Sequence, residues 1–104
     1  MQEEGVNLIF GVPGLKVHCK ACCITREEQG KIVRYGFIST GNFNESTAGI
    51  YTDYTLFTAN RKLLKEVESV FDFFEVNYRQ HRYKHLLVAP NYLRNGIERL
   101  VRRE

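Results

Sequence analysis

The stretch LKVHCKACCITREEQGKIVRYGFIS, residues 15–39, decides the fold. Apolar and polar side chains alternate over residues 15–26, and residues 31–39 are rich in Ile, Val, Tyr and Phe, which is typical of two strands. The polar segment between them, EEQG at residues 27–30, ends in glycine and favours a tight turn. The stretch therefore predicts a β-hairpin.

This hairpin places two cationic side chains on one strand face. Residues two apart on a strand project from the same face, so His18 and Lys20 converge while Val17 and Cys19 face the other way. If Glu27 and Gly30 flank a two-residue loop, the numbers of opposed residues sum to about 57, which sets His18 opposite Ser39. The pattern thus predicts a cationic pair beside the segment STGN, residues 39–42.

Outside the hairpin, the strongest signal is a helix after Asn60, which is a typical N-cap residue. Its apolar residues recur at spacings of three and four: Leu63, Leu64, Val67, Val70, Phe71 and Phe74. Residues 6–10 and 86–90 are expected to be short strands. Residues 76–85, which connect the helix after Asn60 to the strand expected at residues 86–90, are expected to be a basic linker. Residues 47–54 are expected to form a turn or two of helix, residues 55–58 an extended segment, and residue 91 onward a helix. The fold class is therefore α/β, a mixed sheet with at least two helices packed on it.

Composition narrows the class of protein. The chain has 104 residues, 43% of them hydrophobic, and a formal net charge of +3, which permits an anionic partner but is low for a dedicated nucleic-acid binder. No stretch reaches the length of a membrane span and the start lacks a signal-peptide pattern, so the cytoplasm is the expected location. An apolar run close to the start and a final helix without a stop signal indicate a piece of a longer protein.

The chemistry of His18 and Lys20 suits phosphate. An imidazole is a nucleophile toward phosphorus, and a neighbouring ammonium neutralises phosphoryl oxygens as charge builds up on them. Asn42 adds an amide donor just beyond the second strand, where small residues allow backbone N–H groups to approach a phosphate. An isolated H-x-K is by itself more often a solvated strand face, and the STGN turn beside it is what favours the functional interpretation.

Other residues leave alternatives open. The cysteines Cys19, Cys22 and Cys23 are near His18, but alternating directions on a strand are unlike a zinc site, so reduced thiols packed as small hydrophobes are expected and no metal ligand is assigned. His81 and His85 lie in the basic linker, which is either a plain connection or a contact for a polyanion. Tyr51 and Tyr54 either pack or stack on a nucleotide base.

Three blocks of the sequence together resemble the C-terminal catalytic half of polyphosphate kinase, the long type distantly related to phospholipase D. They are GLKVHCKACCI, YGFISTGNFNESTAGIYTDYTLFTA and HLLVAPNYLRNGIERL, and they span almost the whole chain. The TGNFN segment with the following TA and YTD is far more specific than H-x-K. The resemblance implies a phospholipase D-like fold, of which this chain is an incomplete fragment.

The resemblance also implies an activity: reversible transfer of the terminal phosphate of ATP to inorganic polyphosphate through a phosphohistidine. On matching positions, His18 is the histidine that is phosphorylated, Lys20 the lysine of H-x-K, Asn42 the asparagine of the turn, and Tyr51 the tyrosine that stacks on adenine. Mg²⁺ is the implied cofactor, with ligands outside this chain. The implied partners are ATP or ADP, polyphosphate, the remaining domains of the parent and a homo-oligomer, with no nucleic acid; membrane association of the parent is a further option.

Two departures and a domain division qualify the resemblance. Ser39 stands where the family usually has the first glycine of G-T-G-N, and Thr25 stands where phospholipase D enzymes have an aspartate, which disfavours a phosphodiesterase or nuclease. Residues 1–84 are expected to end the first catalytic domain and residues 85–104 to start the second, so the isolated chain is expected to be inactive. The alternatives are that phosphodiesterase or nuclease, and a noncatalytic polyanion-binding module.

Overall fold

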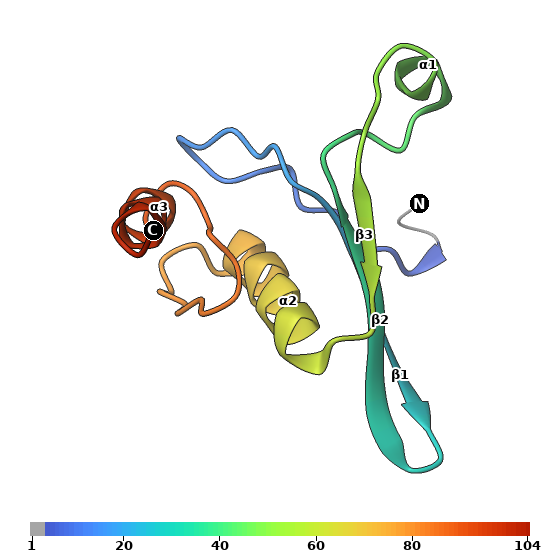
Figure 1. The fold of residues 1–104 in the computed structure, drawn as a ribbon. Coiled ribbons are helices and arrows are strands. Elements are labelled where there is room, and N and C mark those ends of the chain that lie inside the picture. Colours follow the sequence, from blue (N-terminus) through green and yellow to red (C-terminus); the bar gives the residue numbers. More distant parts are fainter. Residues whose placement is uncertain (1–3) are drawn as a thin grey trace.

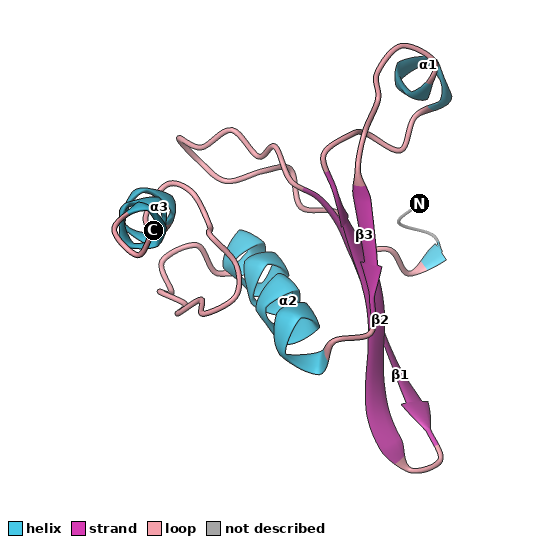
Figure 2. Ribbon diagram, in the orientation of Figure 1, coloured by secondary structure: helices cyan, strands magenta, loops and turns pink. Residues whose placement is uncertain are grey.

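A three-stranded antiparallel sheet with one long helix against it forms the centre of the fold in the computed structural model, which describes residues 4–104 (Figures 1 and 2). The strands are β1 (Lys20–Glu28), β2 (Lys31–Ser39) and β3 (Thr55–Thr58), in the order β1-β2-β3. The helices are α1 (Glu45–Ala48), α2 (Arg61–Glu75) and α3 (Leu93–Val101). The fold is thus mixed α and β as expected. The expectation of a mixed sheet was wrong for the described residues, because both strand pairs are antiparallel.

The hairpin forms as predicted, but with a different register. The turn residues are Gln29 and Gly30, both with positive φ (50° and 72°), as a two-residue hairpin loop that matches the twist of its strands requires. Lys20 therefore lies opposite Ser39, and the prediction that His18 would do so was wrong. The shift equals two residues, so the face on which each side chain lies is unchanged.

The first strand is shorter than predicted. It begins at Lys20 and not at residue 15, because its partner β2 ends at the opposed residue Ser39. Residues 16–19 continue without a partner strand, and only an isolated bridge joins Val12 to Leu15 before them. His18 consequently lies just outside the sheet, in the segment that leads into β1.

Helix α2 confirms the sequence prediction closely. The side chain of Asn60 accepts hydrogen bonds from the backbone N–H groups of Lys62 and Leu63, which caps the helix. Leu64, with 0% of its surface exposed, packs against Gly36 in the middle of β2, and Val67 is also buried. The Arg34 side chain of β2 donates a hydrogen bond from Nη2 to Oε2 of Glu68 on α2, at 2.9 Å. The helix thus covers the sheet face that carries Ala21 and Cys23, opposite to the face of Lys20.

Two predicted strands were wrong. Residues 6–10 form none, and Phe10 is 92% exposed, because an apolar run becomes a strand only where a partner strand supplies its hydrogen bonds. Residues 86–90 form none either, since Leu86 donates its backbone N–H to the Glu66 side chain and not to a neighbouring strand. The short helix α1 begins at Glu45, earlier than predicted, because Asn44 caps it.

The remaining expectations are met in part. Residues 55–58 form β3, and a helix follows residue 91 as α3. Residues 76–85 have no helix or strand, in keeping with a linker. No helix of the described part is long and apolar enough to cross a membrane.

Candidate active site

His18 and Lys20 contact each other at the start of β1. The Nζ atom of Lys20 lies 2.7 Å from Nε2 of His18. An ammonium is only a donor, so in this contact the imidazole is neutral, accepts at Nε2 and carries its proton on Nδ1. The prediction that the two side chains converge is confirmed, and the nitrogen they share is one that a phosphoryl group can approach, because the His18 side chain is exposed.

A row of polar side chains crosses the sheet next to this pair. Lys20 of β1 lies opposite Ser39 of β2, which lies opposite Thr55 of β3, so all three share one face. The hydroxyl oxygens of Ser39 and Thr55 are 2.9 Å apart. The row connects the cationic pair with the loop that follows β2.

Asn42 and Tyr51 line one open hollow of about 470 Å³ beyond the ends of β2 and β3. The Asn42 backbone carbonyl accepts a hydrogen bond from the N–H of Asn44, at 2.9 Å, just before α1. The Tyr51 ring is 66% exposed and free to stack on a flat ligand. The structure thus brings together two pairs, His18 with Lys20 and Asn42 with Tyr51. Within residues 4–104 no hydrogen bond joins one pair to the other.

Two residues of this loop had not been singled out from the sequence. Phe43 stacks on Phe37 of β2 with ring centroids 4.4 Å apart, which anchors the loop on the sheet face that carries Lys20. Asp53 accepts a hydrogen bond from the Thr40 hydroxyl at 3.0 Å and lies so close to Gly41 that any side chain there would overlap its carboxylate. The sequence offered one signal for each residue. Phe43 is an aromatic residue directly after Asn42, and the glycine at position 41 indicated that another group lies close to the backbone there.

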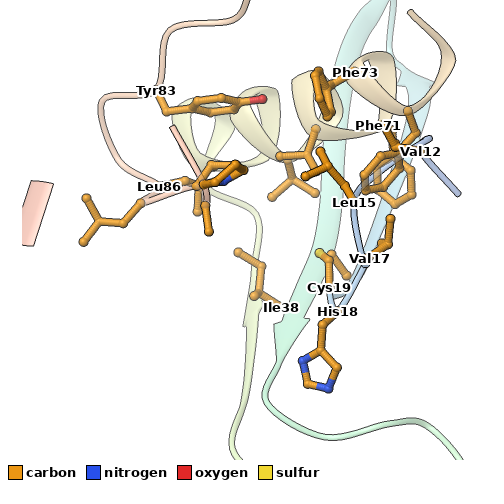
Figure 3. Close-up of a pocket in the computed structure, with 18 of the residues that line it drawn as sticks. Val12, Leu15, Val17, His18, Cys19, Ile38, Phe71, Phe73, Tyr83 and Leu86 are labelled. Atoms are coloured by element: carbon orange, nitrogen blue, oxygen red, sulfur yellow. The ribbon is translucent and has the colours of Figure 1, made fainter. Parts of the chain in front are cut away.

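An apolar cavity of about 520 Å³ lies on the other side of the strand segment, between α2 and residues 83–90 (Figure 3). Val17, His18 and Cys19 line it together with Phe71 of α2, and the His18 ring extends away from the other labelled side chains. Burial raises the pKa of the Cys19 thiol, although the nearby Lys20 charge acts in the opposite direction. The predicted division is therefore present only in part, because Val17 and Cys19 line the cavity but remain exposed, Val17 at 42%. The expectation that Cys19 is packed as a small hydrophobe was wrong, since no partner strand covers the segment before β1.

The linker that follows α2 is held by one carboxylate. Glu66 of α2 accepts hydrogen bonds from three successive backbone N–H groups, those of Lys84, His85 and Leu86, at 2.7–2.9 Å. Nδ1 of His85 lies 2.9 Å from the same carboxylate, whose side chain is 12% exposed. Burial pushes the pKa of Glu66 up, but these hydrogen bonds outweigh it and hold the pKa below its ordinary value.

Replacing Glu66 with glutamine is expected to release this linker. Glutamine offers one acceptor oxygen and turns an NH₂ group toward backbone donors, so the loss should be about 1–3 kcal/mol. Because the folded-state pKa is lowered, the carboxylate stabilises the wild type above its ordinary pKa of 4.5, and this contribution disappears as the pH falls through the folded-state pKa. The protection factors of the amides of residues 84–86, which compare each exchange rate with that of an unfolded chain at the same pH, should therefore fall in acid in the wild type only.

The matched control for this prediction is Glu98→Gln on α3. Glu98 pairs with Arg94 at 3.2 Å, but both side chains are largely exposed (51% and 87%). An exposed pair of this kind contributes little, so the control should leave exchange at residues 84–86 unchanged. Equal protection in Glu66→Gln and the wild type at neutral pH would show that the carboxylate does not hold the linker.

Comparison with known proteins adds the relationship that the site alone does not give. Residues 1–80 match the sequence model of a family described as polyphosphate kinase C-terminal domain 1. A polyphosphate kinase of Vibrio cholerae serotype O1 is 48% identical over 101 residues, which is 97% of this chain and 14% of that protein. A polyphosphate kinase of Escherichia coli strain K12 is 47% identical over 104 residues, 100% of this chain and 15% of that protein.

The similarity therefore extends along the entire chain, whereas the chain spans about a seventh of the length of these relatives. A match over 80 of 104 residues, together with nearly half of the positions identical, is far more than a shared H-x-K or G-N turn accounts for. The chain belongs to the polyphosphate kinase family.

Proposed function

We propose that this chain supplies a phosphohistidine site of a polyphosphate kinase, in which His18 carries phosphate between ATP and inorganic polyphosphate. The observation that carries the proposal is the 2.7 Å contact between Nε2 of His18 and Nζ of Lys20. It puts a nucleophilic nitrogen next to a positive charge at the start of β1, where the His18 side chain is exposed. Membership of the polyphosphate kinase family supports ATP and polyphosphate as the proposed substrates.

The proposed transfer has two steps. Nε2 of His18 attacks the γ-phosphorus of ATP, a P–N bond forms, the bond from phosphorus to the bridging oxygen breaks, and ADP leaves. A terminal oxygen of polyphosphate then attacks the same phosphorus, and the P–N bond breaks. Lys20 exchanges its contact with Nε2 for the phosphoryl oxygens, so its charge opposes the negative charge of each transition state. Both steps are reversible because each exchanges one phosphoryl bond for another of similar kind.

Asn42 and Tyr51 are the proposed contacts for the rest of the nucleotide. The hollow that they share lies beyond the strand end that carries Ser39, the residue opposite Lys20. The exposed ring of Tyr51 suits stacking on adenine, and the Asn42 amide suits a phosphoryl oxygen. This division keeps the base at the outer end of the hollow and the phosphates toward the cationic pair.

Magnesium remains part of the proposal for the parent, where it would neutralise phosphate charge. Among residues 4–104, no group of three or more His, Cys, Asp or Glu side chains is arranged to hold a metal ion. The ligands of the ion are proposed to lie in other parts of the parent. No step above depends on it.

The wider setting is proposed from the family resemblance. Residues 1–84 would end a first phospholipase D-like catalytic domain and residues 85–104 would begin a second, so that the complete site forms only in the parent. The parent would act in the cytoplasm, with a homo-oligomer as its assembly. Isolated, the 104 residues should not catalyse transfer.

Incubation of the full-length parent with ATP and short-chain polyphosphate tests the proposal. Lengthening of polyphosphate with equimolar release of ADP is the expected result, and excess ADP should reverse it. Release of alcohol from a phosphodiester, without ADP-dependent reversal, would instead identify a phosphodiesterase. Binding of polyphosphate that is weakened by salt, with no turnover, would identify a binding module.

A further inference from the structure

The hydroxyl group of Ser39 is at the junction of the two halves of the candidate site. Ser39 is the last residue of β2, opposite Lys20 on one side and Thr55 on the other. It also precedes Asn42 by three residues, so the loop that carries Asn42 leaves the sheet at this point. In Figure 1 this is the upper end of the sheet, from which the chain continues toward α1.

Three polar groups surround the Ser39 hydroxyl. The backbone N–H of Gly41 donates to Oγ at 3.2 Å, the hydroxyl of Thr55 is 2.9 Å away, and the backbone carbonyl of Tyr54 is 3.3 Å away. A hydroxyl has one proton to donate and two lone pairs that accept. When the Ser39 hydroxyl donates its proton to the Tyr54 carbonyl, its oxygen accepts one hydrogen bond from the Gly41 N–H and one from the Thr55 hydroxyl. No part of the group is then left for a substrate.

We propose that Ser39 is a positioning residue for phosphoryl transfer, which holds the Asn42 loop against β3 by binding the Gly41 N–H; this inference rests on the proposed function. It is not a catalytic residue, because its hydrogen-bonding capacity is used within the protein. A glycine at this position has no hydroxyl and cannot make any of the three contacts. Ser39 thus acts on the reaction through Asn42.

Neighbouring contacts define how large the effect should be. Thr40 also ties the loop to the opposite segment, through its N–H to the Tyr54 carbonyl at 3.0 Å and its hydroxyl to Asp53 at 3.0 Å. These bonds remain when the Ser39 hydroxyl is removed, so the loop should loosen and not detach. Displacing a substrate-positioning group by about 1 Å lowers the reaction rate by roughly 10²-fold. Because Asn42 should be displaced by less than this, a loss of about tenfold in rate is expected.

The test compares Ser39→Ala, Ser39→Thr and Ser69→Ala in the full-length parent. Ser39→Ala should lower kcat about tenfold, leave the KM for ATP within about twofold, and accelerate hydrogen exchange at the Gly41 amide. Ser39→Thr keeps the hydroxyl and should restore both. Ser69→Ala removes a hydroxyl that donates to the Lys65 carbonyl on α2, outside the site, and should change neither.

A double-mutant cycle with Asn42→Ala makes the inference specific. If Ser39 acts through Asn42, adding Ser39→Ala to Asn42→Ala should cause no further loss of kcat. Two losses that multiply, or an unchanged Gly41 amide in Ser39→Ala, would overturn the inference. A wild-type parent without kinase activity would refute the proposed function instead, and exchange at Gly41 would still report on the role of Ser39.

Discussion

Replacing His18 with alanine in the full-length parent is expected to lower ATP-dependent polyphosphate synthesis by a factor of about 10⁴ or more. The reason is that His18 is the proposed covalent carrier, and the neighbouring Lys20 cannot replace it because a cationic ammonium is not a nucleophile. The His18 side chain is exposed, so the fold should remain intact. Steady-state rates and the melting temperature of both proteins measure the two effects separately.

Lys16→Ala is the matched control for this substitution. Lys16 is an exposed residue of the same unpaired segment, two positions before His18, and its side chain has no hydrogen bond or ion pair with the rest of residues 4–104. Its replacement should leave the rate within about twofold and the melting temperature unchanged. A His18→Ala protein that retains more than a tenth of the wild-type rate would contradict covalent catalysis by this histidine.

Replacing Gly36 with alanine is expected to produce the largest loss of stability of any single change considered. Gly36 is in the middle strand, opposite Cys23 on one side and Thr58 on the other. An added Cβ would overlap the backbone carbonyl of Cys22 and lie 2.8 Å from Cδ2 of Leu64, the most deeply buried side chain. Neither a strand backbone nor a fully buried leucine yields easily, so the expected destabilisation is about 3 kcal/mol.

Gly49→Ala provides the comparison for that change. Gly49 follows α1, its φ of −76° suits any residue, and the nearest atoms to an added Cβ are 3.7 Å away or farther. This variant should stay within about 0.5 kcal/mol of the wild type. Thermal denaturation of the parent, together with hydrogen exchange in β1 and β2, distinguishes Gly36→Ala from Gly49→Ala. Similar protection of these strands in both variants would mean that α2 does not pack closely against Gly36.

Local signals predicted the central elements of the fold well. A single asparagine, Asn60, marks the start of α2, because its side chain satisfies N–H groups that no residue of the first helical turn can satisfy. The content of Ile, Val, Tyr and Phe predicted the bounds of β2 correctly, and the glycine at position 30 located the turn to within a residue. These features depend on neighbours in sequence, which is why sequence reasoning reaches them.

Features that depend on distant partners were not predictable in this way. The register of the hairpin required knowing that Gln29 adopts positive φ, although it is not a glycine. Leu86 was expected in a strand because its segment is apolar, yet a carboxylate twenty residues earlier, Glu66, takes its N–H. No periodicity marks such a contact.

The candidate site shows the same contrast. Spacing of two on a strand correctly placed His18 beside Lys20, even though His18 lies just before the strand begins. The residues themselves nominated Asn42 and left Tyr51 open between packing and stacking, the family resemblance supported both, and the structure places both around one hollow. Ser39 was predicted to lie opposite His18 and was seen to depart from the usual glycine, but its positioning role was not predictable because it depends on contacts with Thr55 and Gly41.

The most direct measurement of the central claim is the location of phosphate on the parent after brief incubation with γ-labelled ATP. A phosphohistidine is stable in alkali and labile in acid, so peptides should be separated at high pH and sequenced by mass spectrometry. We predict label on His18, removed by added ADP with re-formation of ATP and absent from His18→Ala. Label that persists in His18→Ala, or that resides on another residue, would contradict the account.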